Sequence, residues 1–214
     1  MKRVILLLLL SMLLCGCDEQ ADVPEEAVTE TSPPVETTLA ETDGDVELKT
    51  LEAVLTDGET LRLSVMGKQD TDTGKYGVRE ISVYRGGQQI QTLEMMTAIE
   101  KDGISGIALG YTESFALEDT VKLKDVDFDG NPDLEVCGWC PNNAIPYYYW
   151  IWDPDTEQFQ YAFLLQLREV NAEKRQLIAW YKVENGLYHT DYYQVNDQKE
   201  LELLQRDVED VRPN

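Results

Sequence analysis

An acidic turn lies between two segments in which apolar and polar residues alternate, and this limits the folds that the chain can adopt. Residues 125–136 have the sequence Asp-Val-Asp-Phe-Asp-Gly-Asn-Pro-Asp-Leu-Glu-Val, in which four aspartates fall within nine positions. Apolar residues occupy every second position in the flanking stretches 121–124 and 133–136. This period of two is that of a β-strand and not of a helix. We therefore predict two strands joined by a loop whose concentrated negative charge calls for a cation.

The spacing of the oxygen-bearing residues is typical of a calcium loop. In the twelve-residue EF-hand loop, ligands come from positions 1, 3, 5, 7, 9 and 12, with glycine at position 6. Gly130 stands at position 6 here, and Val136 replaces the bidentate glutamate of position 12. We expect a weak Ca²⁺ site, since extracellular modules work with dissociation constants of about 10⁻⁴–10⁻³ M. The expected ligands are Asp125, Asp127, Asp129, the carbonyl of Asn131, and Asp133. The alternative is an acidic turn whose side chains cap their own backbone.

The first seventeen residues are typical of a bacterial lipoprotein signal peptide. Two basic residues precede an apolar run that is too short to cross about 30 Å of hydrocarbon. The run ends in Leu14-Cys15-Gly16-Cys17, which resembles a lipobox, so we expect Cys17 to be lipidated. The alternative is an ordinary cleaved secretory signal. Acyl chains on Cys17 would anchor the chain on the outer face of the cytoplasmic membrane, or on the periplasmic side in a two-membrane cell.

Residues 18–47 are expected to form a disordered acidic tether. They hold eleven acidic residues and no lysine or arginine, together with threonine, proline and alanine. Residues 48–214 still carry 30 acidic and 16 basic residues, a net charge of −14. A domain this acidic does not fit nucleic acid, which needs clustered lysine and arginine. It favours cations or a basic protein surface as partners.

Residues 48–214 are expected to fold as a single all-β domain. Short alternating segments separated by turn residues predict an antiparallel meander, either propeller-like or closed as a sandwich or barrel. Gly86-Gly87 predicts a hairpin turn, and Asn185-Gly186 predicts another. Residues 164–175 are the only stretch for which we predict a short helix.

An aromatic stretch at residues 147–152 predicts a central or tightly covered strand. Aromatic side chains are common in sheets because they pack across strands. The alternative is an exposed platform for sugar rings or a partner, formed by Tyr148, Trp150 and Trp152.

The order of features along the chain resembles that of a known family. An acidic loop is followed by an aromatic strand, the turn Asp153-Pro-Asp-Thr156 and Phe159. The chain is similar to single-loop extracytoplasmic proteins related to FG-GAP and VCBS repeats, over about residues 119–206. The resemblance implies an all-β, propeller-like fold and the calcium ligands given above. Some proteins of this kind are periplasmic immunity proteins against peptidoglycan-degrading toxins, which implies an inhibitor role.

The remaining reactive residues do not form a familiar catalytic pattern. Cys137 and Cys140 form a Cys-x-x-Cys without a following helix, so we favour a local disulfide over free thiols or redox chemistry. His189, the only histidine, lies on a predicted strand. We therefore expect a membrane-anchored, non-catalytic binding or inhibitor module, not an enzyme. The alternatives are a carbohydrate- or solute-binding lipoprotein that uses the aromatic strand, and a glycan hydrolase that uses paired carboxylates.

Overall fold

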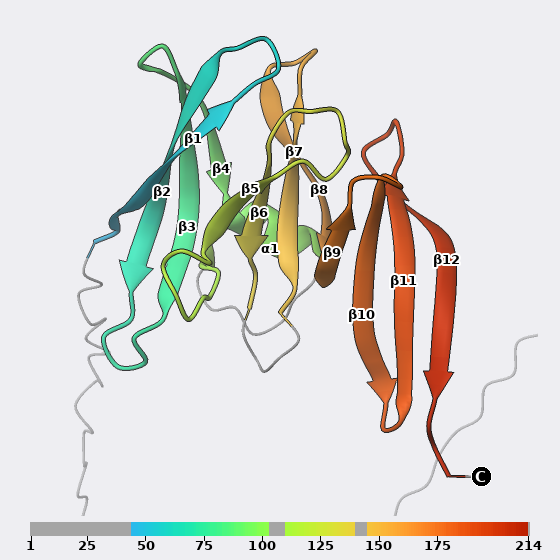
Figure 1. Ribbon diagram of the computed structural model, residues 1–214. Helices are drawn as coiled ribbons and strands as arrows, with labels where there is room; N and C mark the ends of the chain where they lie inside the picture. The colour runs from blue at the N-terminus through green and yellow to red at the C-terminus, as the bar shows by residue number, and fades with distance from the viewer. Residues whose placement is uncertain (1–43, 103–109, 140–144, 214) are drawn as a thin grey trace, which may run out of the picture. The chain divides into compact units, whose positions relative to one another are not determined.

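The computed structural model describes residues 44–102, 110–139 and 145–213, and these form three antiparallel sheets (Figure 1). The strand orders are β1-β2-β3-β4, β5-β6-β7-β8 and β12-β11-β10-β9, which we call sheets A, B and C. The strands are β1 (Val46–Val54), β2 (Thr60–Gln69), β3 (Tyr76–Arg85), β4 (Gln88–Glu94), β5 (Val121–Lys124), β6 (Asp133–Cys137), β7 (Tyr147–Asp153), β8 (Gln158–Leu165), β9 (Leu167–Asn171), β10 (Gln176–Glu184), β11 (Leu187–Val195) and β12 (Leu201–Asp210). The all-β prediction is confirmed, and no sheet closes on itself within the described ranges.

Two hydrophobic clusters place sheet B between the other two sheets. One cluster joins apolar residues of sheet A to one face of sheet B, and the second joins the opposite face of sheet B to sheet C. Strand β7 contributes to both, because Tyr148 and Trp150 lie in the first cluster while Tyr149 and Ile151 lie in the second. The prediction that this aromatic strand is central and covered on both faces is therefore confirmed.

The turns that join neighbouring strands follow from their residues. Gly86 and Gly87 have φ values of 56° and 84°, which suits a two-residue hairpin between β3 and β4. Gly186 has a φ of 79° in the hairpin between β10 and β11. Both hairpin predictions are confirmed, since only glycine adopts such angles without strain.

The helix prediction at residues 164–175 is wrong. These residues end β8 and form β9, which pairs with β10 through registers such as Leu177 opposite Val170. Pairing with a neighbouring strand overrides the weak local preference of such a short stretch. The helix α1 (Met95–Asp102) was not predicted, although it buries Met95, Ala98 and Ile99 at helical spacing. No helix among the described residues is both long and apolar enough to span a membrane.

The tether prediction extends too far toward the C-terminus. Val46 and Glu47 already belong to β1, which pairs with β2 from Val46 opposite Gly67 onward. The polar, acidic composition suggested a tether, but Glu47 accepts a hydrogen bond from Ser64 and is part of the sheet.

Candidate metal centre

The acidic run forms the loop between β5 and β6, as predicted. Lys124 ends β5 opposite Asp133, the first residue of β6, so the loop closes a hairpin of sheet B. Phe128 and Gly130 have positive φ values of 63° and 92°. A Cβ atom on Gly130 would lie 3.0 Å from Cγ2 of Thr56, which explains why glycine occupies the tightest point of the turn.

Three of the predicted ligands converge. One carboxylate oxygen each from Asp125, Asp127 and Asp133 lies within 4.8 Å of the others. Two oxygens on one calcium ion are separated by at most about 5 Å, because each Ca–O bond is about 2.3–2.6 Å long. The three carboxylates could therefore hold a single metal ion.

Asp133 is the most deeply buried of the three. It is 0% exposed, and its two oxygens accept hydrogen bonds from the backbone N–H groups of Val126 at 2.8 Å and Trp152 at 2.9 Å. Burial raises the pKa of Asp133 to about 8 in spite of these two bonds, and the charges of Asp127 and Asp129 add to the rise. Burial thus disfavours the charged form of this carboxyl, and a bound metal ion would favour it.

Asp125 carries an unsatisfied oxygen. Its Oδ2 accepts a hydrogen bond from the N–H of Gly130 at 3.1 Å, but its buried Oδ1 has no hydrogen-bond partner among the described residues. Burial raises the pKa of Asp125, and the negative charges of Asp127 and Asp129 act in the same direction. A buried polar atom without a partner is costly, and a metal ion would remove that cost.

The side chains of the other two predicted ligands are used elsewhere. Asp129 accepts hydrogen bonds from the backbone N–H and the side-chain amide of Asn131, at 2.7 and 3.2 Å. The Oδ1 of Asn131 accepts from the N–H and hydroxyl of Thr56, at 2.9 and 3.0 Å. The sequence suggested only a backbone carbonyl from Asn131, so this link to the β1–β2 turn of sheet A was missed.

Two cationic side chains from sheet C also reach the loop. Lys199, between β11 and β12, forms an ion pair with Asp127, whose side chain is only 5% exposed. Arg175, between β9 and β10, donates to the carbonyls of Asp127 at 3.2 Å and Phe128 at 3.0 Å. Burial acts to lower the pKa of Lys199, but its hydrogen bond and ion pair with Asp127 raise it overall. Neither residue had a sequence signal, because the pairing of distant loops sets both contacts.

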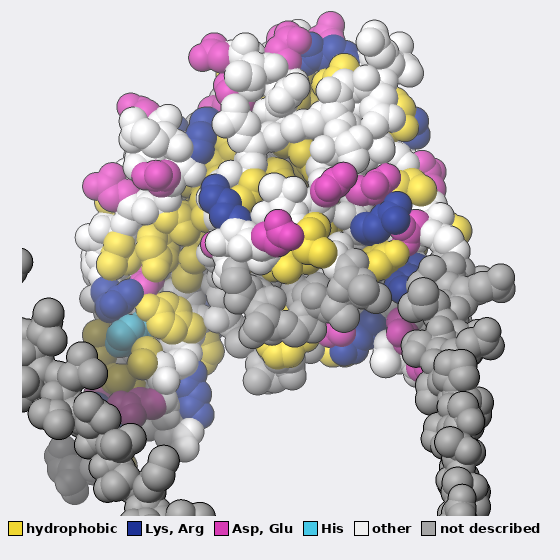
Figure 2. All heavy atoms as spheres, turned by 180° about the vertical axis from the view of Figure 1, so that it is seen from behind, with side chains coloured by type: hydrophobic (Ala, Val, Ile, Leu, Met, Phe, Trp, Pro, Cys, Tyr) yellow, Lys and Arg dark blue, Asp and Glu magenta, His cyan; other side chains and the backbone are white. Residues whose placement is uncertain are grey.

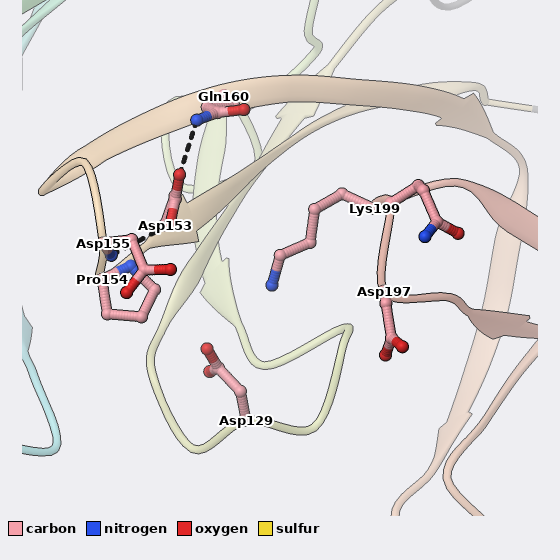
Figure 3. Close-up of a pocket in the computed structure, with 8 residues that line it drawn as sticks. Asp129, Asp153, Pro154, Asp155, Gln160, Asp197 and Lys199 are labelled. Carbon is pink, nitrogen blue, oxygen red and sulfur yellow. Dashed lines mark hydrogen bonds between the residues drawn. The ribbon is translucent and has the colours of Figure 1, made fainter.

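The loop therefore links all three sheets. Asn131 connects it to sheet A through Thr56, while Lys199 and Arg175 connect it to sheet C. A pocket lies beside it, and Figure 3 shows the carboxylates of Asp129, Asp153, Asp155 and Asp197 around the side chain of Lys199. The lining residues are Asp129, Asp153, Pro154, Asp155, Gln160, Asp197, Gln198 and Lys199.

The aromatic side chains lie in the core as expected, and the alternative of an exposed platform is wrong. Tyr148, Trp150 and Trp152 are at most 3% exposed and pack in the cluster between sheets A and B. The rings of Trp152 and Phe159 meet edge to face at 5.0 Å. These side chains build the core, because β7 is an inner strand covered on both faces. A carbohydrate site on this strand loses its structural basis.

The cysteine predictions fall partly outside the described residues. Cys17 and Cys140 are not described, so neither the lipidation nor the disulfide with Cys137 is tested. Cys137 is buried at the end of β6, and its Sγ lies 3.1 Å from the carbonyl oxygen of Glu113. His189 packs edge to face against Tyr181 on the paired strand.

No protein-family model, curated protein or solved structure matches this chain.

Proposed function

We propose that this chain is a lipid-anchored extracytoplasmic protein that binds one Ca²⁺ in its β5–β6 loop and acts as a non-catalytic binding or inhibitor module. The observation that carries the metal site is the convergence of Asp125, Asp127 and Asp133, with a buried oxygen of Asp125 left unsatisfied. Carboxylate oxygens without nitrogen or sulfur ligands select hard cations. Calcium suits this loop better than magnesium because it accepts irregular geometry and a larger number of oxygens.

Calcium would stabilise the junction of the three sheets. The ion would neutralise the carboxylates of the loop whose Asn131 holds sheet A and whose Asp127 meets sheet C. A ligand that binds only the native state adds to its stability by mass action. The calcium-bound loop would then fix the positions of strands that are far apart in the sequence.

The proposed location and partner are supported by sequence features given above. The signal-like segment ending in Cys17 supports a membrane anchor, and the net charge of −14 over residues 48–214 supports a basic protein partner. A cationic cell-wall hydrolase is one such partner, in keeping with the resemblance to immunity proteins. Three consecutive four-stranded meanders also fit the propeller-like fold implied by that resemblance.

The calcium claim is tested by isothermal titration of the purified chain after treatment with a chelator. We expect binding to one site, with a dissociation constant of about 10⁻³ M or tighter. The variant Asp125→Asn keeps the size of the side chain but removes its charge, and it should abolish the heat. The variant Asp72→Asn changes an exposed aspartate in another turn and should bind like the wild type. Equal heats from the two variants would show that the ion binds elsewhere.

A further inference from the structure

Strand β12 is an uncovered sheet edge. It pairs with β11 from Leu201 opposite Val195 to Asp210 opposite Leu187, and it stands last in the strand order of sheet C (Figure 1). No described residue pairs with its outer side. Nine of its ten residues are exposed. The outer N–H and C=O groups of such a strand form a template for one more strand.

Some features that prevent strand addition are present in β12, namely charged side chains and one irregularity in the pairing, but others are missing. The sequence of β12, Leu-Glu-Leu-Leu-Gln-Arg-Asp-Val-Glu-Asp, contains no proline and no lysine. Its one basic side chain, Arg206, is held by two hydrogen bonds to Asp191 on β11, at 2.6 and 2.7 Å. A single irregularity in the pairing lies between Leu203 and Gln205. The six residues from Gln205 to Asp210 pair with β11 without interruption.

One face of the edge carries apolar side chains between charged ones, because Arg206, opposite Asp191, and Asp210, opposite Leu187, lie on it as well. Leu203 and Val208 lie opposite Tyr193 and His189 of β11, on the face that buries Asp191. They are 45% and 58% exposed. Figure 2 shows hydrophobic side chains next to the histidine, with a Lys or Arg side chain also against it. A partner strand could therefore bury apolar side chains here.

The other face of the edge is acidic. Asp207 and Glu209 lie opposite Thr190 and Tyr188 of β11. Glu202 lies on the same face nearer the start of β12, opposite Gln194. All three acids are exposed, and none forms an ion pair with a lysine or arginine among the described residues. An adjacent strand would gain from basic residues on this face, since oppositely charged cross-strand pairs are favourable.

We propose that β12 is a strand-pairing surface for an extended segment of a partner protein in which apolar residues alternate with lysine or arginine. The backbone ladder would hold the segment, and the period of two would place its apolar side chains beside Val208 and its basic side chains beside Asp207 and Glu209. The inference rests on the proposed role as a binding module and gives the chemistry of the partner.

A second copy of this chain fits the same edge poorly. When two identical strands pair antiparallel about a two-fold axis normal to the sheet, the same face of each strand points to the same side. The acidic rows of the two copies would then share one face, where like charges are unfavourable. A net charge of −14 over residues 48–214 of each copy adds to this repulsion.

The test uses the full chain and a fluorescent peptide of about eight residues in which valine and lysine alternate. Anisotropy titrations should show this peptide binding at least about tenfold more tightly than a peptide of alternating valine and glutamate. Methylation of the peptide's backbone nitrogens should remove most of the binding, because a ladder needs those N–H donors. Equally tight binding of the methylated peptide would overturn the proposal, as would the absence of binding at millimolar peptide.

Two charge-reversal variants locate the site. Asp207→Lys with Glu209→Lys should weaken the lysine peptide at least about tenfold and strengthen the glutamate peptide. Glu52→Lys with Glu94→Lys makes the same change of charge on the exposed edge strands of sheet A and should leave both affinities near the wild-type values. Equal effects of the two pairs would overturn the assignment to β12.

Two further measurements distinguish a peptide partner at β12 from self-association and from calcium binding. A dimer detected by sedimentation and dispersed by Asp207→Lys with Glu209→Lys would make a second copy the occupant and overturn the proposal. Peptide titrations are run in calcium and in chelator beside the calorimetric calcium titration, so that peptide binding by a chain that takes up no calcium would support β12 while contradicting the calcium site. Calcium binding without peptide binding would do the reverse.

Discussion

Sheets B and C each bury one aspartate completely, but they treat its charge in opposite ways. Asp191, on β11, accepts two hydrogen bonds from Arg206 and one each from the hydroxyls of Tyr181 and Tyr193. Asp133, on β6, accepts hydrogen bonds only from two backbone N–H groups. The side chains nearest to it in the loop include two more carboxylates, those of Asp125 and Asp127. Both side chains are 0% exposed.

The difference appears in the pKa values of the two groups. The hydrogen bonds from Arg206 hold the pKa of Asp191 down at about 2, against the effect of burial. Burial raises the pKa of Asp133 to about 8. Asp191 has its counter-charge in the hydrogen-bonded guanidinium of Arg206, whereas Asp133 has no hydrogen bond from a cationic side chain among the described residues. The comparison therefore separates an aspartate neutralised by a side chain of the protein from one in a cluster that could hold a metal ion.

The largest expected effect concerns the hydrogen-bonded cluster of Asp191 and Arg206. Arg206→Met leaves the buried charge of Asp191 without its main partner, so the melting temperature should fall by roughly 10 °C. Calorimetry in the presence of chelator provides the measurement. Adding Asp191→Asn to the same chain should restore part of the loss, because the unpaired charge is removed.

Arg212→Met is the matched control. Arg212 pairs with Asp210 and Glu184 at the surface, where ion pairs contribute little, so the melting temperature should change by no more than about 2 °C. Equal falls in melting temperature for Arg206→Met and Arg212→Met would show that the buried charge of Asp191 does not need Arg206 for stability.

The next effect concerns the carboxylate cluster of Asp125, Asp127 and Asp133. Calcium at a hundred times its dissociation constant should raise the free energy of unfolding by about 2.7 kcal/mol. Asp125→Asn should remove this rise, whereas Asp72→Asn should retain it. Urea unfolding with and without calcium measures both. A rise that survives in Asp125→Asn would place the stabilising ion outside the β5–β6 loop.

A smaller effect tests the role of Lys199. Its ammonium group pairs with Asp127 and so competes with a cation for the same charge. Lys199→Met should strengthen calcium binding about tenfold, because a nearby like charge is removed, and should lower the stability of the metal-free protein. Lys174→Met removes an exposed charge from the β9–β10 turn as a control. Unchanged or weaker calcium binding in Lys199→Met would show that this ammonium group does not oppose the metal.

Much of this arrangement follows from local sequence patterns. The period of two around residues 125–136 predicted the strand–loop–strand unit, and the glycine pairs predicted the hairpins. The loop spacing also predicted the three residues that converge, since short-range geometry decides where Asp125, Asp127 and Asp133 point.

The missing parts depend on contacts between distant segments. Lys199 and Arg175 reach the loop only because sheet C packs against sheet B, which no local pattern encodes. The aromatic strand was correctly expected to be covered on both faces, but only its place inside sheet B decides against the exposed platform. In the same way, pairing with β10 decides that residues 167–171 form a strand and not a helix.

The most direct measurement follows the carboxyl carbons of Asp133 and Asp191 by NMR across a pH titration, in chelator and then in calcium. In chelator, Asp133 should titrate near pH 8, so that its contribution to stability is complete below about pH 4 and is lost as the pH rises through 8. Asp191 should titrate near pH 2 in both conditions, with its contribution present above about pH 4 and lost as the pH falls through 2. Calcium should abolish the titration of Asp133 near pH 8 and leave Asp191 unchanged. A titration of Asp133 that calcium does not alter would contradict the metal centre.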